Sequence, residues 1–396
     1  MTKNFDAIVT REKQYFAPGV RRWPVALVRG EGSRVWDADG KQFIDMTAGW
    51  GVTALGHSHP ALVEAISDQA RTLMQTTNVV YSEPQLELAE RLDGITPDNM
   101  HRSFFVSSGA EANEGAIKLA HRATGRSGYI STFNSFHGRT LGSLGVLGQD
   151  KYRAPWNAIL REASFVPYGD LEAAKAVIND QTAAMIVEPI QGEGGVNIPP
   201  EGYLKGLEEA LHAVGALLIM DEVQTCIGRT GRWLALEHSG VRPDIITLGK
   251  GIGGGVPLAA FTASEDIFET LVPGDHGGTY AGNLLTCRAG STVMRVIEDE
   301  GLVQRAAQTG DAVMARLEAL RKEVPERVEA VRGAGLLLGL VVNDAEFAAS
   351  THSELRERGV LVNLTAERVL RLFPALNIPD SDLDEALGIL EELIRA

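Results

Sequence analysis

The pattern of apolar residues in the middle of the chain predicts short strands that alternate with helices. Five apolar runs have the length of strands, and longer segments with helical periodicity separate them. The runs are SFFVSS (103–108), GYIST (128–132), AAMIVEPI (183–190), ALLIMDEV (216–223) and DIITLG (244–249). The clearest helical segment is AEANEGAIKLAHRAT (110–124). Because the strands are apolar on both faces, they indicate a mainly parallel sheet with helices on both sides.

The two ends of the chain have a different pattern. The N-terminal part contains the strand-like stretch VALVRGEGSRVWDADGKQFIDM with an Asp-Gly turn, and the part after about residue 285 is helix-rich. Within that second part, VLVNLTAERVLRLFP predicts two further strands. We therefore expect residues 1–50 and 285–396 to form one smaller domain beside a large domain of residues 51–284.

Composition narrows the classes of function. The chain has 396 residues, with 37 basic and 52 acidic side chains and a net charge of −15, which argues against binding to nucleic acid or an acidic membrane. The only two cysteines, Cys226 and Cys287, have no paired spacing, which favours a reducing compartment. The N-terminus lacks an apolar signal core, and no apolar run reaches the roughly 18 residues of a membrane span. We expect a cytoplasmic protein.

Two charged residues follow apolar strands and carry the most information about chemistry. Asp221 ends LLIMD, and Lys250 follows DIITLG. In parallel sheets ligands bind beyond the carboxyl ends of the strands, so both side chains are predicted to face one site. A lysine in a partly apolar pocket loses its proton readily and can form an imine with an aldehyde. The alternatives are a surface lysine, and an aspartate that binds a metal or caps a helix.

A second segment has the pattern of an anion site. Ser108, Gly109 and Ala110 lie between a predicted strand and an amphipathic helix, and their small side chains let backbone N–H groups approach a phosphate. A plain helix cap by Ser108 is the alternative.

Two other motifs resemble known sites but lack parts of them. The glycines at 251 and 253–255 follow Lys250, whereas the glycines of a nucleotide-binding Walker loop precede its lysine. His57 and His59 have no evident third ligand, so we expect no metal site.

Two arginines stand in apolar or small-residue surroundings, Arg139 in FNSFHGRTLGS and Arg371 in RVLRLFPAL. Arginine is the natural bidentate partner of a carboxylate. The pair could hold both ends of a dicarboxylate, or one of them could hold the single carboxylate of a diamino acid. Structural ion pairs are the alternative for each.

Together these motifs resemble the class III pyridoxal-phosphate aminotransferases, specifically their acetylornithine/ornithine branch. The resemblance spans nearly the whole chain and includes GHSHPALVEAI, SSGAEANE, FHGRT, IVEPIQGEGGV, MDEVQTCIGRTG, LGKGIGGGVP, HGGTYAGN and RLFPALNI. It implies fold type I of the aspartate-aminotransferase superfamily. That fold is α/β, with a mainly parallel seven-stranded sheet covered by helices on both faces in the large cofactor-binding domain, and a smaller α+β domain from the two chain ends.

The resemblance also implies the residues that bind pyridoxal 5'-phosphate. Lys250 is the Schiff-base lysine and proton shuttle, and Asp221 pairs with the ring nitrogen. The other expected cofactor contacts are Gln224 at the ring hydroxyl, Phe136 on the ring face, Ser108, Gly109 and Ala110 at the phosphate, and Thr279 from a partner subunit. The last contact implies a homodimer with shared active sites.

The same resemblance implies the substrates. Arg139 is expected to hold the α-carboxylate of an acylated diamino acid, and Arg371 that of glutamate or 2-oxoglutarate. Glu193 neutralises Arg371 while a side chain without a carboxylate is bound, and Tyr81 separates ornithine-like from 4-aminobutyrate enzymes. The expected reaction moves the terminal amino group of N2-acetylornithine to 2-oxoglutarate. Other ω-amino donors (ornithine, 4-aminobutyrate, succinylornithine, a carrier-linked lysine) and a non-catalytic cofactor-binding regulator are the alternatives.

Overall fold

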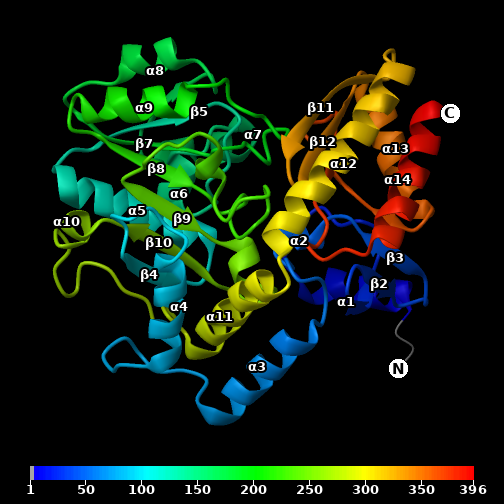
Figure 1. The fold of residues 1–396 in the computed structure, drawn as a ribbon, viewed down its shortest axis with the longest axis horizontal. Coiled ribbons are helices and arrows are strands. Elements are labelled where there is room, and N and C mark those ends of the chain that lie inside the picture. The colour runs from blue at the N-terminus through cyan, green and yellow to red at the C-terminus, as the bar shows by residue number, and fades with distance from the viewer. Residues whose placement is uncertain (1–3) are drawn as a thin grey trace.

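The computed structural model describes residues 4–396. A seven-stranded sheet forms the centre of the larger part of the molecule (Figure 1). Its order is β4 (Arg102–Val106), β10 (Ala259–Ala263), β9 (Ile245–Leu248), β8 (Leu217–Asp221), β7 (Thr182–Val187), β5 (Gly128–Thr132) and β6 (Ser164–Val166). Only β10 runs against the others. The predicted mainly parallel sheet is confirmed, and each of the five predicted runs overlaps one of its strands.

Helices cover this sheet on both faces, as its apolar strands predicted. All six residues of β7 are buried, and from Ala184 to Val187 they alternate between two hydrophobic cores. Met185 and Val187 pack into the core that also contains residues of α3, α4, α9 and α11, whereas Ala184 and Ile186 pack with residues of α5. The helices of this part are α2 (Ala48–Gly51), α3 (Pro60–Thr72), α4 (Glu83–Asp93), α5 (Gly109–Thr124), α6 (Leu141–Gly145), α7 (Asp150–Arg153), α8 (Leu171–Val177), α9 (Tyr203–His212), α10 (Glu265–Phe268) and α11 (Leu284–Asp299), with the 3₁₀ turns η1 (Ala154–Ile159), η2 (Ala235–His238) and η3 (Lys250–Gly253).

Two strands of the sheet were not predicted from the pattern. β6 has only three residues, Ser164–Val166, and β10 is the small-residue run AAFTA. Alanine has little intrinsic preference for strands, so β10 depends on its neighbours. It pairs antiparallel with both β4 and β9 and is fully buried.

The smaller part of the molecule contains two four-stranded sheets and three long helices, at the right of Figure 1. One sheet has the order β1 (Leu27–Glu31), β2 (Arg34–Asp37), β3 (Gln42–Asp45), β13 (Val360–Leu361). The other has the order β11 (Val328–Ala334), β12 (Leu337–Val342), β15 (Val369–Leu372), β14 (Asn363–Thr365). The helices are α12 (Leu302–Glu323), α13 (Ala345–Glu357) and α14 (Asp380–Arg395).

The two chain ends meet in this smaller part, as expected. β3 pairs in parallel with β13, with Ile44 opposite Val360, and the two ends share a hydrophobic core. Arg34 forms an ion pair with Asp382 at 2.7 Å. Residues 360–374, predicted to hold two strands, hold three, because the segment leaves one sheet after β13 and enters the other at β14. The boundaries at residues 50 and 284 stay predictions.

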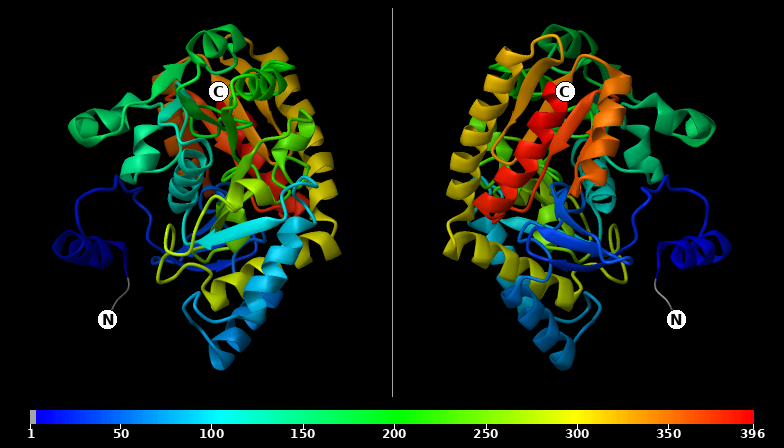
Figure 2. Two further views of the ribbon diagram at one scale, coloured as in Figure 1. Left: turned by 90° about the vertical axis from the view of Figure 1, so that its left-hand side faces the viewer. Right: turned by 90° about the vertical axis from the view of Figure 1, so that its right-hand side faces the viewer.

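The first helix, α1 (Phe5–Tyr15), projects from the body of the molecule (Figure 2). None of its residues is buried, and Tyr15 and Phe16 at its end are 76% and 58% exposed. Within residues 4–396, no helix combines the length and the apolar character needed to cross a membrane.

Glu222, directly after β8, is a buried carboxyl group that makes stability depend on pH. It accepts hydrogen bonds from the backbone N–H of Leu236 at 2.7 Å and from the Thr225 hydroxyl. Burial raises the pKa of Glu222 to about 7 from its ordinary value of 4.5, although these hydrogen bonds act in the opposite direction. The native state therefore binds this proton more tightly than the unfolded state. That contribution to stability is complete below pH 4.5 and is lost as pH rises through 7.

We expect Glu222→Gln to remove this pH dependence, because the amide stays neutral. Between pH 4.5 and values above 7, the free energy of unfolding of the variant should gain about 3 kcal/mol relative to wild type, since one pKa unit corresponds to about 1.4 kcal/mol. Urea denaturation of both proteins over this pH range measures the difference. A difference that stays constant with pH would contradict the assignment.

Candidate active site

Three neighbouring parallel strands bring charged side chains to one edge of the large sheet. Glu188 follows β7, Asp221 is the last residue of β8, and Lys250 comes two residues after β9. All three line a pocket of about 290 Å³. Eight of the predicted site residues line it: Gly109, Ala110, Phe136, Arg139, Glu193, Asp221, Gln224 and Lys250. The expectation that Asp221 and Lys250 face a common site is thus met.

Asp221 is 3% exposed and is fixed on both carboxylate oxygens. Its Oδ2 accepts a hydrogen bond from Asn113 Nδ2 at 2.8 Å and lies 2.7 Å from His137 Nδ1, while Oδ1 accepts from the backbone N–H of Val223 at 3.0 Å. Thr247 donates to the other end of the Asn113 amide at 2.8 Å. This network holds the carboxylate in one orientation at the pocket wall. Its pairing with a cofactor ring nitrogen stays a prediction.

Lys250 begins η3 with a backbone φ of 46°, a conformation that is unusual for a residue with a long side chain. Burial lowers the pKa of its amine, and the nearby Arg371 lowers it further. Glu193, Asp221 and Glu188 act in the opposite direction, but the net shift is downward. A larger fraction of this lysine is therefore neutral and nucleophilic than of an exposed one.

The amino end of α5 is the segment in which the sequence predicted an anion site. The Ser108 side chain accepts a hydrogen bond from the Glu111 N–H at 3.3 Å, so it caps the 16-residue helix, as the alternative interpretation proposed. Gly109 and Ala110 line the pocket. A Cβ at Gly109 would lie 2.6 Å from a methyl group of Val223, so only glycine lets the backbone approach the pocket at this point.

The loop after β5 contributes an aromatic ring and a cation. Phe136 packs edge-to-face on Tyr152, with ring centroids 5.9 Å apart. The guanidinium of Arg139, whose side chain is exposed, lies 4.7 Å above the Tyr152 ring. This contact orients the Arg139 cation at the pocket without neutralising it by a carboxylate.

Arg371 is completely buried and forms the centre of a three-residue contact. Its Nη1 lies 2.7 Å from Glu193 Oε1 and donates to Gln224 Oε1 at 3.0 Å, while Gln224 Nε2 donates to Glu193 Oε1 at 3.2 Å. Burial alone would raise the pKa of Glu193, but Arg371 and Lys250 outweigh it and the pKa is lowered. Nε and Nη2 of Arg371 are buried and have no hydrogen-bond partner among residues 4–396.

Four predicted site residues do not line this pocket. Arg371 contacts it through Glu193 and Gln224, and Ser108 is exposed at the helix end. Thr279 is exposed and lines a neighbouring hollow with Ser107 and Glu111, and Tyr81 is fully exposed.

Three polar or charged residues that line the pocket were not predicted: Asn113, His137 and Glu188. Each lies in a motif that the sequence did single out, SSGAEANE, FHGRT and IVEPIQGEGGV. The position of Glu188 directly after an apolar strand was a usable signal, the same one that identified Asp221. The contacts of Asn113 and His137 with Asp221 depend on tertiary packing and have no local signal.

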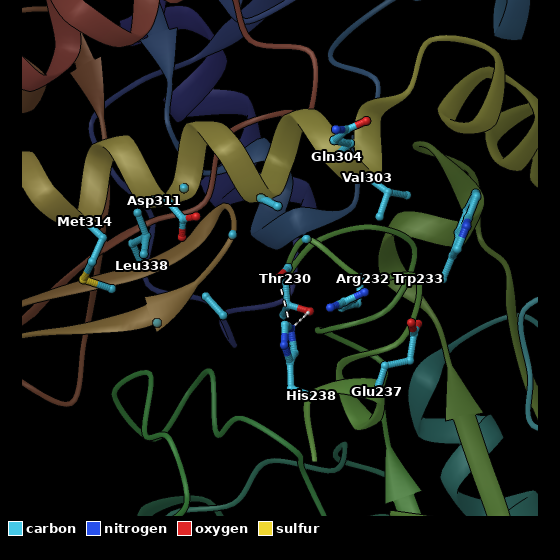
Figure 3. A pocket seen from close by; sticks show the side chains of 16 residues that line it. Thr230, Arg232, Trp233, Glu237, His238, Val303, Gln304, Asp311, Met314 and Leu338 are labelled. Atoms are coloured by element: carbon cyan, nitrogen blue, oxygen red, sulfur yellow. Dashed lines mark hydrogen bonds between the residues drawn. The ribbon is translucent and has the colours of Figure 1, made fainter. Parts of the chain in front are cut away.

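A larger pocket, of about 660 Å³, lies elsewhere and has different chemistry (Figure 3). It is formed by the segment containing Thr230, Arg232 and His238, by α12, and by the turn between β11 and β12. It shares no lining residue with the pocket of Lys250 and contains no lysine. We therefore place the reaction in the smaller pocket.

A mainly parallel seven-stranded sheet with this lysine and aspartate at the ends of adjacent strands defines a fold-type-I pyridoxal-phosphate enzyme. The family model described as aminotransferase class-III matches residues 15–394, and the chain belongs to this family. The resemblance seen in the sequence is confirmed, and the protein is a pyridoxal-phosphate-dependent transaminase.

Three relatives illustrate the similarity. The chain is 43% identical to the acetylornithine aminotransferase of Methanothermobacter thermautotrophicus, over 98% of each chain. The crystal structure of acetylornithine aminotransferase from Elizabethkingia anophelis has a TM-score of 0.86 at 33% identity, over 100% of each chain. The structure of ornithine aminotransferase from Toxoplasma gondii has a TM-score of 0.91 at 31% identity and covers 99% of this chain and 94% of its own.

The pocket residues fit pyridoxal phosphate. Gly109, which packs directly against Val223, brings the amino end of α5 to the pocket wall, where backbone N–H groups suit a phosphate, and Lys250 has the lowered pKa that reaction with an aldehyde requires. Asp221 offers a fixed carboxylate to a protonated ring nitrogen. When bound, the cofactor accepts the electrons that remain when a proton leaves the substrate carbon.

We expect Lys250→Ala to abolish turnover and the visible absorbance band of the bound cofactor, because no other lysine lines the pocket. The loss of activity should exceed about a thousandfold, the scale on which removal of a nucleophile acts. Spectra of the purified variant with added cofactor, beside an activity assay, measure both. A variant that kept the band and full turnover would refute the role of Lys250.

Proposed function

We propose that the enzyme transfers the terminal amino group of N2-acetylornithine, or of a close analogue, to 2-oxoglutarate, giving a semialdehyde and glutamate. The observation that carries this proposal is the ion pair of the buried Arg371 with Glu193, which lines the same pocket as Arg139. The names of the relatives from Methanothermobacter thermautotrophicus and Elizabethkingia anophelis support the choice of substrate.

The pair of Arg371 and Glu193 lets one pocket accept two unlike substrates. When glutamate or 2-oxoglutarate binds, Glu193 moves away from Nη1 of Arg371, and the guanidinium that it uncovers holds the α-carboxylate. When the acylated donor binds, Glu193 neutralises Arg371, since an unpaired buried charge would cost several kcal/mol. Gln224 keeps its bond to Arg371 Nη1 in either case and preserves the orientation of the guanidinium.

Of the other residues, Arg139 binds the substrates and Lys250 transfers a proton. Arg139 takes the α-carboxylate of the acylated donor and later the side-chain carboxylate of glutamate. The Lys250 Nζ, once free, removes and returns the proton of the reacting carbon, for which its lowered pKa suits it. Asp221, held by Asn113 and His137, keeps the positive charge on the ring nitrogen.

A panel of amino donors tests the substrate assignment. With added cofactor and 2-oxoglutarate, we expect acetylornithine to give glutamate with a kcat/KM about tenfold or more above that of 4-aminobutyrate, because the latter lacks the acylamino group. Ornithine, succinylornithine and a carrier-linked lysine complete the panel. The assignment is wrong if 4-aminobutyrate works well while acetylornithine gives no glutamate. No turnover with any donor would favour a cofactor-binding regulator instead.

We infer that the enzyme is a homodimer with shared active sites. The segment from Leu73 to Leu86 exposes large apolar side chains, with Val79 88% and Tyr81 102% exposed. Monomers rarely expose a continuous apolar patch of this kind. Hydrogen bonds join this segment to the loop of Thr279, including Gln75 Nε2 to Thr279 O at 2.6 Å. A second copy that covers the patch brings Thr279 to the phosphate of its neighbour and buries Tyr81 beside the shared site.

Substitution of Thr279 tests whether the active site is shared between two subunits. Thr279→Ala should weaken binding of the cofactor by about tenfold, the scale of one hydrogen bond to a charged group, while the variant stays dimeric. Sedimentation of wild type should give twice the mass of the chain, and titration of the apoenzyme with pyridoxal phosphate gives the affinities. A monomer with full activity would contradict the shared site.

We propose a cytoplasmic location for the enzyme. Cys226 and Cys287 are both free and buried, which suits a reducing compartment. Fluorescent tagging of the chain in its own cells would test this.

A further inference from the structure

Glu188 is a buried carboxyl group at the active site to which the reaction described above assigns no task. It follows β7, which lies between β5 and β8 in the sheet. Its side chain is 4% exposed and lines the pocket with Lys250 and Asp221. Burying a carboxyl group is costly unless specific partners compensate, so its contacts are informative.

Both hydrogen bonds to the Glu188 carboxyl group come from backbone amides of different loops. Oε1 accepts from the N–H of Phe136 at 2.9 Å, in the loop after β5, which we call the aromatic loop (133–139). Oε2 accepts from the N–H of Gly192 at 3.3 Å, in the loop after β7, which we call the Glu193 loop (189–195). One side chain thus joins the loop of Phe136 and Arg139 to the loop of Glu193.

Other contacts hold the two loops at different points. Gln191 Nε2 donates to Thr132 Oγ1 at 3.0 Å and to Phe133 O at 2.8 Å, so it joins the loops close to the strand ends. Thr365 donates to Glu193 O at 2.7 Å and ties the Glu193 loop to β14. Glu188 is the contact on the side of the pocket, and its partner Gly192 directly precedes Glu193 in the chain. Its removal should therefore release the loops at the site and leave the strand ends in place.

We propose that Glu188 is a positioning residue for substrate selection: its carboxyl group fixes the Glu193 loop against the aromatic loop, so that Glu193 returns to Arg371 whenever the acylated donor binds. This inference rests on the proposed function, in which Glu193 is paired with Arg371 in one half-reaction and displaced in the other. Loss of the anchor at Gly192 makes the paired arrangement less favourable. It therefore harms the half-reaction of the donor more than that of glutamate.

Glu188→Gln is the direct test. The amide oxygen keeps the shorter bond to Phe136, and the NH₂ group faces the Gly192 N–H, where two donors cannot bond. In single-turnover assays of the holoenzyme, kcat/KM for the donor should fall about tenfold more than kcat/KM for glutamate, the effect of one unsatisfied buried donor. Glu222→Gln is the matched control, because Glu222 is also a buried carboxyl group beside a strand end but does not line the pocket. It should leave both half-reactions unchanged.

Hydrogen–deuterium exchange of the holoenzyme supplies a readout that is independent of turnover. In Glu188→Gln, amides of residues 190–195 should exchange faster, while those of β7 and β5 keep their protection. Glu222→Gln should show neither change.

Three results would contradict the positioning role of Glu188. An equal fall in both half-reactions, no fall in either, or unchanged exchange in the Glu193 loop would show that Glu188 has no positioning role. If Glu188→Gln does not fold, Glu188→Asp decides, since it keeps the charge but is one carbon too short to reach both amides, and the same selective loss is expected. If wild type prefers another donor, the proposed substrate fails, and the Glu188 comparison is made with that donor.

Discussion

Charge held at the carboxyl edge of the large sheet is the constraint on which the site depends. Asp221, Glu188 and Glu193 provide carboxyl groups there, and Lys250 and Arg371 provide cations. Each side chain is largely buried, and an isolated charge is costly in the protein interior. Each is therefore stable only through the others and through fixed hydrogen-bond donors. Transamination requires both carboxyl groups and cations at this site, because the pocket must lower the pKa of an amine and still hold anionic substrates.

Close packing of small residues makes that arrangement geometrically possible. A Cβ at Gly192 would lie 1.5 Å from Gln224 Oε1, which shows how closely the backbone of the Glu193 loop approaches the amide that contacts Arg371. At Gly109 the same argument applies to the amino end of α5, which packs directly against Val223. The charged contacts thus depend on positions that carry no functional group at all.

The sequence predicted the parts of the fold and site that have a local signal. Strands apolar on both faces, such as β7, were evident from the pattern of apolar residues, and strand-end positions identified Asp221 and Lys250. β10 was missed because its small residues become a strand only between two partners. Likewise, no local pattern showed that residues 360–374 divide between two sheets. Asn113 and His137 reach Asp221 from α5 and the aromatic loop, and such contacts exist only after the chain has folded.

The parallel pairing of β3 with β13 also constrains how the protein is made. Ile44 leaves the ribosome long before its partner Val360 has been translated. At typical rates of about 5 to 20 residues per second, roughly 15 to 60 seconds separate the two, which is ample time for the central sheet to form first. During that interval β1, β2 and β3 present an unpaired strand edge. The nascent chain therefore has a window in which chaperones, or a second nascent copy, can compete for that edge before the C-terminal segment closes it.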